Sequence, residues 1–233
     1  MTNTLTIETS GLTCSVAIKT PIIEKHKILA EPRSHGKVLL PYISELLNDA
    51  GIQVKDINTI GISIGPGSFT GLRIGFAITQ GLAYSNKIPV VPISSLEGMI
   101  HSFCSQSNLP NTCENIKKSI VVVTDAKMGH LNFGHYRVNG LEAETILKDR
   151  LIEISRVEHL ILSLKPELIL VDNLSYFSKF KIDFENTFEV HSRAQDLIRV
   201  TEYRHQIGLS EDVKDLELSY LREADAWQKN RHP

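Results

Sequence analysis

The sequence has 233 residues, of which 42% are hydrophobic and 22% are charged, an ordinary globular composition. This length allows one large domain or two small ones, with ample material for a buried core. The formal net charge of −2 gives no overall attraction to RNA or to a membrane surface, so any nucleic-acid contact would need a local basic patch or a partner's surface.

The N-terminal stretch and the cysteines indicate where the protein works. MTNTLTIETSGLTCSVAIKT lacks the basic start and apolar core of a signal peptide, and no apolar run approaches the roughly 18 to 20 residues of a membrane span. The three cysteines, Cys14, Cys104 and Cys113, form no CxxC pair and no even set. We therefore expect a reduced, cytoplasmic protein whose thiols fill the core.

The first half of the sequence alternates strand and helix patterns. The predicted strands cover residues 5–9, 14–19, 22–29, 59–64 and 88–92. The predicted helices cover residues 37–50, 72–85 and 94–106, the last with Ser94 or Ser95 as N-cap. The first three strands are short and separated by turn signals, which predicts an antiparallel meander.

The second half repeats this plan after a polar, turn-rich stretch at residues 105–118, the predicted domain boundary. Its predicted strands cover residues 119–124, 131–138, 144–147 and 167–172, and its predicted helices cover residues 153–165 and 192–205. Strands followed by helices, twice over, predict an α/β protein. We expect an N-terminal subdomain over residues 1–105 and a C-terminal subdomain over residues 106–233, whose last segment could pack back on the first.

The most unusual stretch is GPGSFTGLR at residues 65–73, between a predicted strand and a helix. A Gly-rich turn at that place is typical of phosphate binding. However, the stretch contains no lysine for a Walker A loop, and its spacing fits neither GxGxxG nor GxSxG. Closing a tight strand-to-helix connection explains every glycine without a ligand. We interpret the loop as structural, formed by Gly65, Pro66, Gly67, Ser68, Phe69, Thr70 and Gly71.

Two of the helices carry more apolar surface than one sheet requires. In the helix at 37–50 the apolar residues spread over roughly 200°, where about 100° suffices. In the helix at 72–85 only Arg73 is charged, and apolar residues and glycines occur nearly all round. Such helices are either fully buried or lie in an interface, and we favour the interface. The effect of Pro41 on the first helix stays open.

Other candidate sites give weaker signals. Glu8 and Asp125 each follow the first strand of one half, where a two-lobed phosphotransferase would place acids on a magnesium ion, although turn-initiating acids fit equally well. No HExxH occurs, and His130 and His135 are expected on opposite faces of a strand, so neither a metal centre nor a zinc peptidase is supported.

The basic residues of the late helix and the tail form another weak candidate site. They are Arg193, Arg199, Arg204, Lys229, Arg231 and His232. They could touch RNA phosphates weakly, but a solvated helix face is the preferred interpretation.

Two long stretches carry a family resemblance. HGKVLLPYISELLNDAG, followed by GISIGPGSFTGLRIGFAITQGLAYSNKIPVVPISSL, resembles the signature of the TsaB (YeaZ) family of the bacterial tRNA threonylcarbamoyladenosine pathway. IETSGLTCSVAI, VVTDAKMG and SYLREADAW match as well. The resemblance is dense over residues 4–98 and patchy beyond them.

The resemblance implies an ASKHA-type fold, with two ribonuclease-H-like subdomains whose mixed sheets are flanked by helices. It implies a non-catalytic scaffold without a cofactor of its own. The scaffold would pair with TsaD, which transfers threonylcarbamoyl to N6 of adenosine 37 in ANN-decoding tRNAs, and act with the ATPase TsaE. It would form a homodimer when TsaD is absent and would reach tRNA only through the complex. The predicted interface residues are Leu39, Leu40, Ile43, Leu47, Leu72, Arg73, Phe76, Ala77, Gln80 and Tyr84.

The sequence departs from the family pattern at three turns. The first strand ends in Glu8-Thr9 instead of Asp-Thr, and Lys127 to His130 replaces Arg-Met-Gly-Glu. Asp172-Asn173 stands where the family has a glycine-rich turn. Glu8, Thr9 and Asp125 are therefore interpreted as vestigial phosphate-loop positions. The alternative is an ASKHA-type phosphotransferase that uses ATP and magnesium at Glu8 and Asp125.

Overall fold

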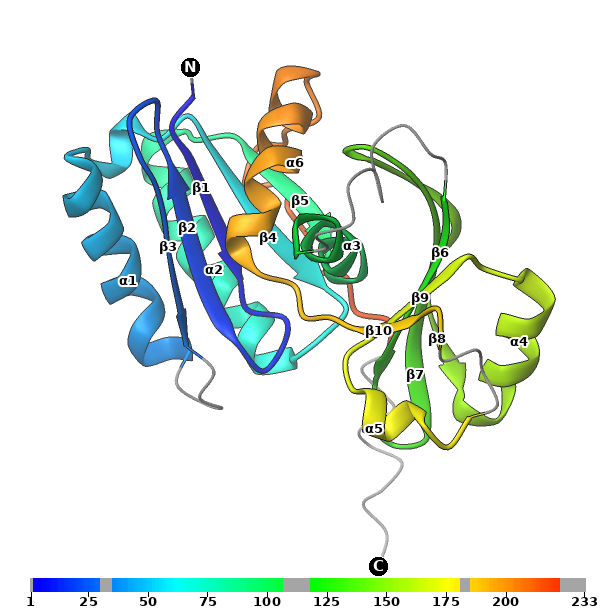
Figure 1. Cartoon of the computed structure of the whole chain (residues 1–233). Coiled ribbons are helices and arrows are strands. Elements are labelled where there is room, and N and C mark those ends of the chain that lie inside the picture. Colours follow the sequence, from blue (N-terminus) through cyan, green and yellow to red (C-terminus); the bar gives the residue numbers. More distant parts are fainter. Residues whose placement is uncertain (1, 30–34, 107–117, 181–184, 223–233) are drawn as a thin grey trace, which may run out of the picture.

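The computed structural model describes residues 2–29, 35–106, 118–180 and 185–222. Two five-stranded mixed sheets lie beside each other, each flanked by helices (Figure 1). The predicted boundary at 105–118 falls largely on residues 107–117, outside the described residues, as do Lys229, Arg231 and His232 of the tail. Within the described ranges no helix has the length and apolar character needed to cross a bilayer.

The first sheet has the strand order β3-β2-β1-β4-β5. Its strands are β1 (Thr4–Glu8), β2 (Cys14–Lys19), β3 (Glu24–Leu29), β4 (Thr59–Gly65) and β5 (Val90–Ser94). The first three strands form the predicted antiparallel meander, and β4 and β5 run parallel to β1. Every residue of β1 is buried, which is typical of a central strand covered on both faces.

Helices cover both faces of this sheet. On one face lie α1 (His35–Ala50) and α2 (Phe69–Asn86). The 3₁₀ helix η1 (Val54–Asp56) connects α1 to β4, and α2 follows β4. Their core residues, such as Leu39 and Ala83, pack with Ile7 and Ile62 of the sheet. The helix α6 (Ala194–Gln206) covers the other face (Figure 1). Residues 194–206 therefore lie against the N-terminal sheet, although β10 (Thr187–Glu189), shortly before them, belongs to the second sheet.

The second sheet has the strand order β10-β9-β6-β7-β8. Its strands are β6 (Lys118–Asp125), β7 (His130–Asn139), β8 (Glu142–Glu153), β9 (Leu168–Val171) and β10 (Thr187–Glu189). Its helices are the 3₁₀ helix η2 (Ile154–Arg156), α4 (Val157–Leu164) and α5 (Leu174–Phe177). The helix α3 (Ser95–Gln106) is buried from Ser95 to Phe103 and packs against both the second sheet and α6.

Several expectations need correction. The strand expected at 144–147 extends over all of β8, and the helix expected at 153–165 is shorter because its first turn is η2. The second helix begins at Phe69 instead of Leu72, since Ser68 caps it by accepting a hydrogen bond from the backbone N–H of Gly71 at 3.2 Å. The helix α1 continues through Pro41, which is exposed and has no N–H to donate to the carbonyl of Lys37.

The cysteines divide into two kinds. Cys14 is a fully buried free thiol, and burial raises its pKa to about 11, so it fills the core as predicted. Cys104 is disulfide-bonded, so the expectation that all thiols are reduced is wrong for it, because spacing in sequence does not show which sulfurs approach in space. Cys113 lies outside the described residues.

The Gly-rich loop fixes α2 to the end of β1. A Cβ added at Gly71 would lie 2.1 Å from the carbonyl oxygen of Thr9, and one added at Gly67 would lie 2.4 Å from the carbonyl oxygen of Ser10. The N–H of Ser68 donates to that Ser10 carbonyl at 2.7 Å. These glycines allow two backbone segments to touch, which no larger residue would permit.

We predict that Gly71→Ala lowers the free energy of unfolding by about 2 kcal/mol or more, because the Thr9 backbone would have to shift. Urea unfolding of both proteins measures this difference. Gly81→Ala is the matched control in the same helix, since nothing lies within 4 Å of its added Cβ. The control should gain up to about 1 kcal/mol from helix propensity. Equal stability of the two variants would contradict this role of the glycine contact.

Candidate partner-binding face

The outer side of α2 carries a nearly uncharged stripe. Its inner side, with Gly75, Thr79 and Ala83, is buried against the sheet. The opposite side exposes Arg73, Ala77, Gln80 and Tyr84, which follow one another at helical spacing. Tyr84 is 66% exposed, an unusual position for a large aromatic side chain. Phe76, another of the predicted interface residues, lies at the edge of this stripe and packs partly buried against the core of the first sheet.

The helix α1 lies beside α2 and adds Leu40, which is 53% exposed. The acidic residues Glu45 and Asp49 of α1 form ion pairs with Lys27 and Lys25 of β3. The two acidic charges of α1 are thereby neutralised on the side of β3, while Lys37 in the first turn of α1 is exposed. We call the exposed side of α1 and α2 the α1–α2 face, represented by Leu40, Arg73, Ala77, Gln80 and Tyr84.

Four of the predicted interface residues do not belong to this face. Leu39, Ile43 and Leu47 of α1 and Leu72 of α2 are buried in the chain's own core. A partner could not touch them without unfolding the helices. Leu39, Ile43 and Leu47 belong to the core of the first sheet, and Leu72 lies beside Gly65 at the end of β4. They support the face from below and cannot form contacts across it.

The carboxylate of Glu8 is hydrogen-bonded within the chain. It is buried, one carboxylate oxygen accepts the N–H of Ser10 at 2.6 Å, and the other accepts the hydroxyl of Ser63. Thr9 is buried beneath Gly71 and Gly75 of α2. A bound cation would have to share the oxygens of Glu8 with these two hydrogen bonds, in a place that is closed to solvent.

Asp125 lies at the end of β6 in the other sheet and has its own local partners. It accepts from the backbone N–H of Lys127 at 2.8 Å and pairs with the ammonium of the same residue. Its own N–H donates to Asp172 at 3.1 Å. Burial raises the pKa of Asp172, and the nearby Asp125 carboxylate adds to that rise. Among the described residues, no cluster of three or more His, Cys, Asp or Glu side chains could hold a metal ion.

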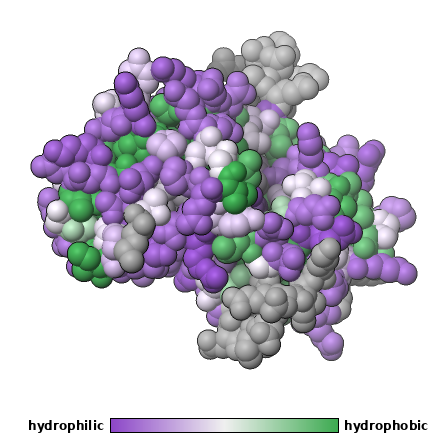
Figure 2. All heavy atoms as spheres, turned by 90° about the horizontal axis from the view of Figure 1, so that it is seen from above, coloured by the Kyte–Doolittle hydropathy of each residue, from purple (hydrophilic) through white to green (hydrophobic). Residues whose placement is uncertain are grey.

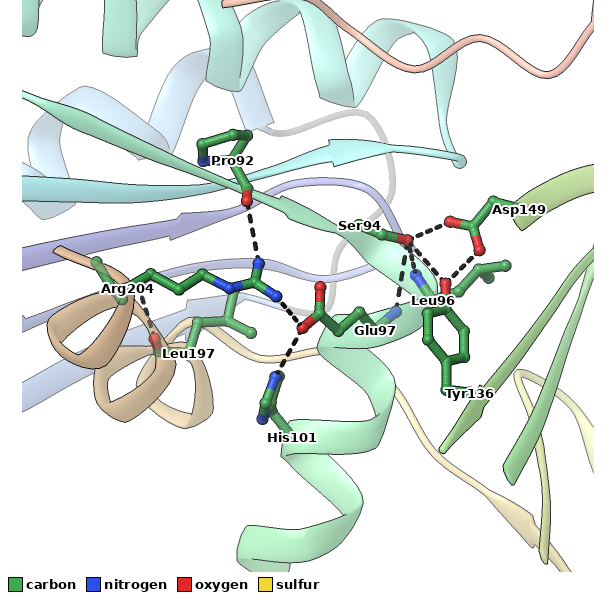
Figure 3. Close-up of polar contacts among 10 residues, drawn as sticks. Pro92, Ser94, Leu96, Glu97, His101, Tyr136, Asp149, Leu197 and Arg204 are labelled. Atoms are coloured by element: carbon green, nitrogen blue, oxygen red, sulfur yellow. Dashed lines mark hydrogen bonds and ion pairs between the residues drawn. The ribbon is translucent and has the colours of Figure 1, made fainter. Parts of the chain in front are cut away.

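A buried polar network lies where α3 begins, between the two sheets (Figure 3). Glu97 accepts from Arg204 Nη2 at 2.5 Å and lies 3.3 Å from His101 Nε2, while Arg204 Nη1 donates to the carbonyl of Pro92 at 3.3 Å. Arg204 therefore does not belong to a solvated helix face, because α6 turns it toward α3 and β5. Of the other two arginines, Arg193 lies directly before α6 and pairs with Asp196, and Arg199 is exposed on α6.

The same network continues toward the second sheet. Ser94 accepts the N–H of Leu96 at 3.2 Å, as an N-cap does, and donates to Asp149 of β8. Tyr136 of β7 also donates to Asp149. Burial raises the pKa of Asp149 and that of Tyr136, while the hydrogen bonds that Asp149 accepts from Ser94 and Tyr136 partly offset the rise in its own pKa. These contacts join β5 of the first sheet to β7 and β8 of the second.

The sequence does not indicate this network, because its pattern predicts a solvated helix face for Arg204. Glu97 and Arg204 are 107 residues apart, and no motif connects them. The one available signal was Ser94 at the predicted start of a helix. We interpret the network as structural support for the joint between the sheets, since its donors and acceptors satisfy one another.

The surface offers other exposed apolar residues, but they are scattered. Figure 2 shows the molecule from above Figure 1, where hydrophobic residues form small separate groups among hydrophilic ones. Ile22, Leu162 and Leu209 are examples of such exposed side chains on separate elements. Single exposed apolar residues are ordinary on a protein surface. The α1–α2 face is therefore the stronger candidate for binding a partner.

Two mixed sheets, each flanked by helices and joined through α3, define an ASKHA-type protein. A family model described as TsaD, tRNA N6-adenosine threonylcarbamoyltransferase, matches residues 28–201. The tRNA threonylcarbamoyladenosine biosynthesis protein TsaB of Buchnera aphidicola subsp. Schizaphis graminum is 34% identical over 202 residues, which cover 83% of this chain and 90% of the relative. The chain belongs to the TsaB (YeaZ) family, as the sequence resemblance predicted.

Other comparisons agree with this membership. The TsaB protein of Escherichia coli is 32% identical over 155 residues, 64% of this chain and 63% of that relative. A solved structure described as an uncharacterized protein with similarity to peptidase YEAZ, from Pseudomonas aeruginosa, has a TM-score of 0.82. It is 23% identical, and the match covers 95% of this chain and all of that one. The predicted ASKHA-type fold is confirmed.

We predict that Glu97→Gln lowers the free energy of unfolding at pH 7 by about 3 kcal/mol, because Arg204 loses its anionic partner in the interior. Burial alone would raise the pKa of Glu97, but hydrogen bonds and charges from His101 and Arg204 outweigh it and lower the pKa below 4.5. The stabilisation is therefore present above about pH 4.5 and is lost as the pH falls through the folded-state pKa.

Urea unfolding of wild type and Glu97→Gln at pH 7 and at about pH 3 tests this linkage. The stability difference should shrink at the lower pH. Glu144→Gln removes the carboxylate of an exposed ion pair with Arg137 and should change stability little at either pH. A difference between wild type and Glu97→Gln that stays constant with pH would contradict the assignment.

Proposed function

We propose that this chain is a non-catalytic scaffold subunit of tRNA threonylcarbamoyladenosine synthesis, and that it pairs through the α1–α2 face with TsaD. In this proposal TsaD transfers threonylcarbamoyl to N6 of adenosine 37 in ANN-decoding tRNAs. The small ATPase TsaE assists the pair, and this chain reaches tRNA only through the complex. The protein works in the cytoplasm and pairs with a second copy of itself when TsaD is absent.

The observation that carries the proposal is the composition of the α1–α2 face. It exposes Leu40 and Tyr84 and carries one charge on α2, that of Arg73, although it lies at the surface of the described chain. Helices on a protein surface ordinarily carry a charged outer side. Ala77 and Gly81 would let a partner helix approach closely. The names of the TsaB relatives supply the pathway, since they are called tRNA threonylcarbamoyladenosine biosynthesis proteins.

A second observation favours a scaffold over a phosphotransferase. The backbone of Thr9 and Ser10 packs against Gly71 and Gly67, so the chain itself fills this side of the Gly-rich loop. Both oxygens of Glu8 already accept hydrogen bonds. An ASKHA-type kinase would need both the loop and an acid at this place. The chain's contribution to the transfer reaction would then be to bind and orient the catalytic subunit.

We expect Ala77→Glu to abolish pairing with TsaD, because a long charged side chain at the centre of the α1–α2 face would hold a partner helix away and would lose its hydration on binding. Ala77 is exposed, so the fold should remain intact. Size-exclusion chromatography with light scattering, on this protein alone and mixed with TsaD, measures the pairing. Circular dichroism confirms that the variant is folded.

Ser163→Glu is the matched control, because Ser163 is exposed on α4 beside the second sheet. It should pair with TsaD as wild type does. A wild-type chain that stays monomeric and ignores TsaD would overturn the proposed function. Pairing that survives Ala77→Glu would move the interface away from the α1–α2 face.

A further inference from the structure

Arg73 is held in one orientation at the start of the α1–α2 face. Its guanidinium lies 3.7 Å from the ring centroid of Phe69, one turn earlier in α2. Its Nε donates to the hydroxyl of Tyr220 at 3.1 Å, and the rings of Phe69 and Tyr220 lie 5.6 Å apart. Two aromatic side chains from distant parts of the sequence therefore fix a cation that is itself exposed.

This cation is not neutralised within the described part of the chain. Arg73 forms no ion pair there, and its Nη1 and Nη2 nitrogens donate no hydrogen bond. The first turn of α2 contains no acidic residue, so the positive end of the helix is not compensated either. The two free nitrogens of a guanidinium are spaced to bind both oxygens of one carboxylate.

The orientation of Tyr220 is set by a C-terminal strap, which we define as residues 216–222. The N–H of Ser219 donates to the carbonyl of Ile64 at 2.8 Å, directly before the Gly-rich loop. Arg222 donates to the carbonyls of Ala126 and Lys127 at 3.2 and 3.0 Å, in the turn between β6 and β7. The strap is anchored on both sides of Tyr220, so the tyrosine is fixed before any partner arrives.

We propose that Arg73, held by Phe69 and Tyr220, is the receptor for a carboxylate side chain of the partner protein that binds the α1–α2 face. This inference rests on the proposed function and identifies a contact within it. A preorganised guanidinium loses little side-chain entropy on binding, and arginine beside aromatic rings is a frequent centre of binding energy.

The surroundings favour one carboxylate over a polyanion such as RNA. The segment after α6, residues 207–222, carries four acidic residues, Glu211, Asp212, Asp215 and Glu217, and two basic ones, Lys214 and Arg222. A phosphate backbone would meet more negative than positive charge along this segment. A single carboxylate on a partner helix that lies on the α1–α2 face can reach Arg73 without crossing this acidic segment.

The test is the dissociation constant for TsaD, measured by calorimetry for wild type, Arg73→Gln and Tyr220→Phe. Arg73→Gln should weaken binding roughly 10- to 100-fold, with a smaller dependence on salt than wild type. Tyr220→Phe should weaken it roughly two- to fivefold, because only the hydrogen bond that orients Arg73 is removed. Lys148→Gln, an exposed change of the same charge on β8, is the matched control and should bind as wild type does.

The outcomes separate the inference from the proposed function. Pairing of wild type that Arg73→Gln leaves unchanged overturns the carboxylate receptor but keeps the α1–α2 interface. Absence of pairing in wild type overturns both. A parallel titration of the isolated chain with tRNA is the second arm. Loss of tRNA affinity in Arg73→Gln with unchanged TsaD affinity would assign Arg73 to an RNA phosphate and contradict the inference.

Discussion

The first subdomain depends on one close contact between two backbone segments. Thr9 and Ser10, at the end of β1, lie directly against the glycines of the Gly-rich loop and of α2. At Gly67 and Gly71 there is room for a hydrogen atom and nothing larger. The loop therefore rests on the end of β1, and Ser68 begins α2 at that point. The loop is packed against the chain's own backbone, and the outer side of α2 takes its orientation from this packing.

Packing of this kind separates support from binding in α1 and α2. Leu39, Ile43 and Leu72 are buried in the core. The outer side of the two helices can therefore carry residues that the fold does not need. The second sheet contributes from a distance, because the buried Glu97–Arg204 pair and the C-terminal strap connect it to the first. The outer side of α1 and α2 is thereby supported from both halves of the chain.

Much of this architecture could be predicted from local patterns, and some of it could not. The central strands and both long helices follow from apolar periodicity, and Arg73, Ala77 and Tyr84 are exposed as an interface requires. An apolar arc of roughly 200° does not reveal which part faces the chain's own sheet, so buried leucines were assigned to the partner side. The Arg73–Tyr220 bond spans 147 residues and leaves no local signal, and the same holds for the position of α6. Whether the exposed residues contact TsaD stays a prediction.

Hydrogen exchange of the backbone amides, followed by mass spectrometry with and without TsaD, tests the central claim most directly, because it maps the contact along the whole chain. The account predicts slower exchange on binding in residues 35–50 and 69–86 and around Tyr220. It predicts no change in α4 or on the exposed edge of β8. Protection confined to the second sheet, with α1 and α2 unchanged, would contradict it.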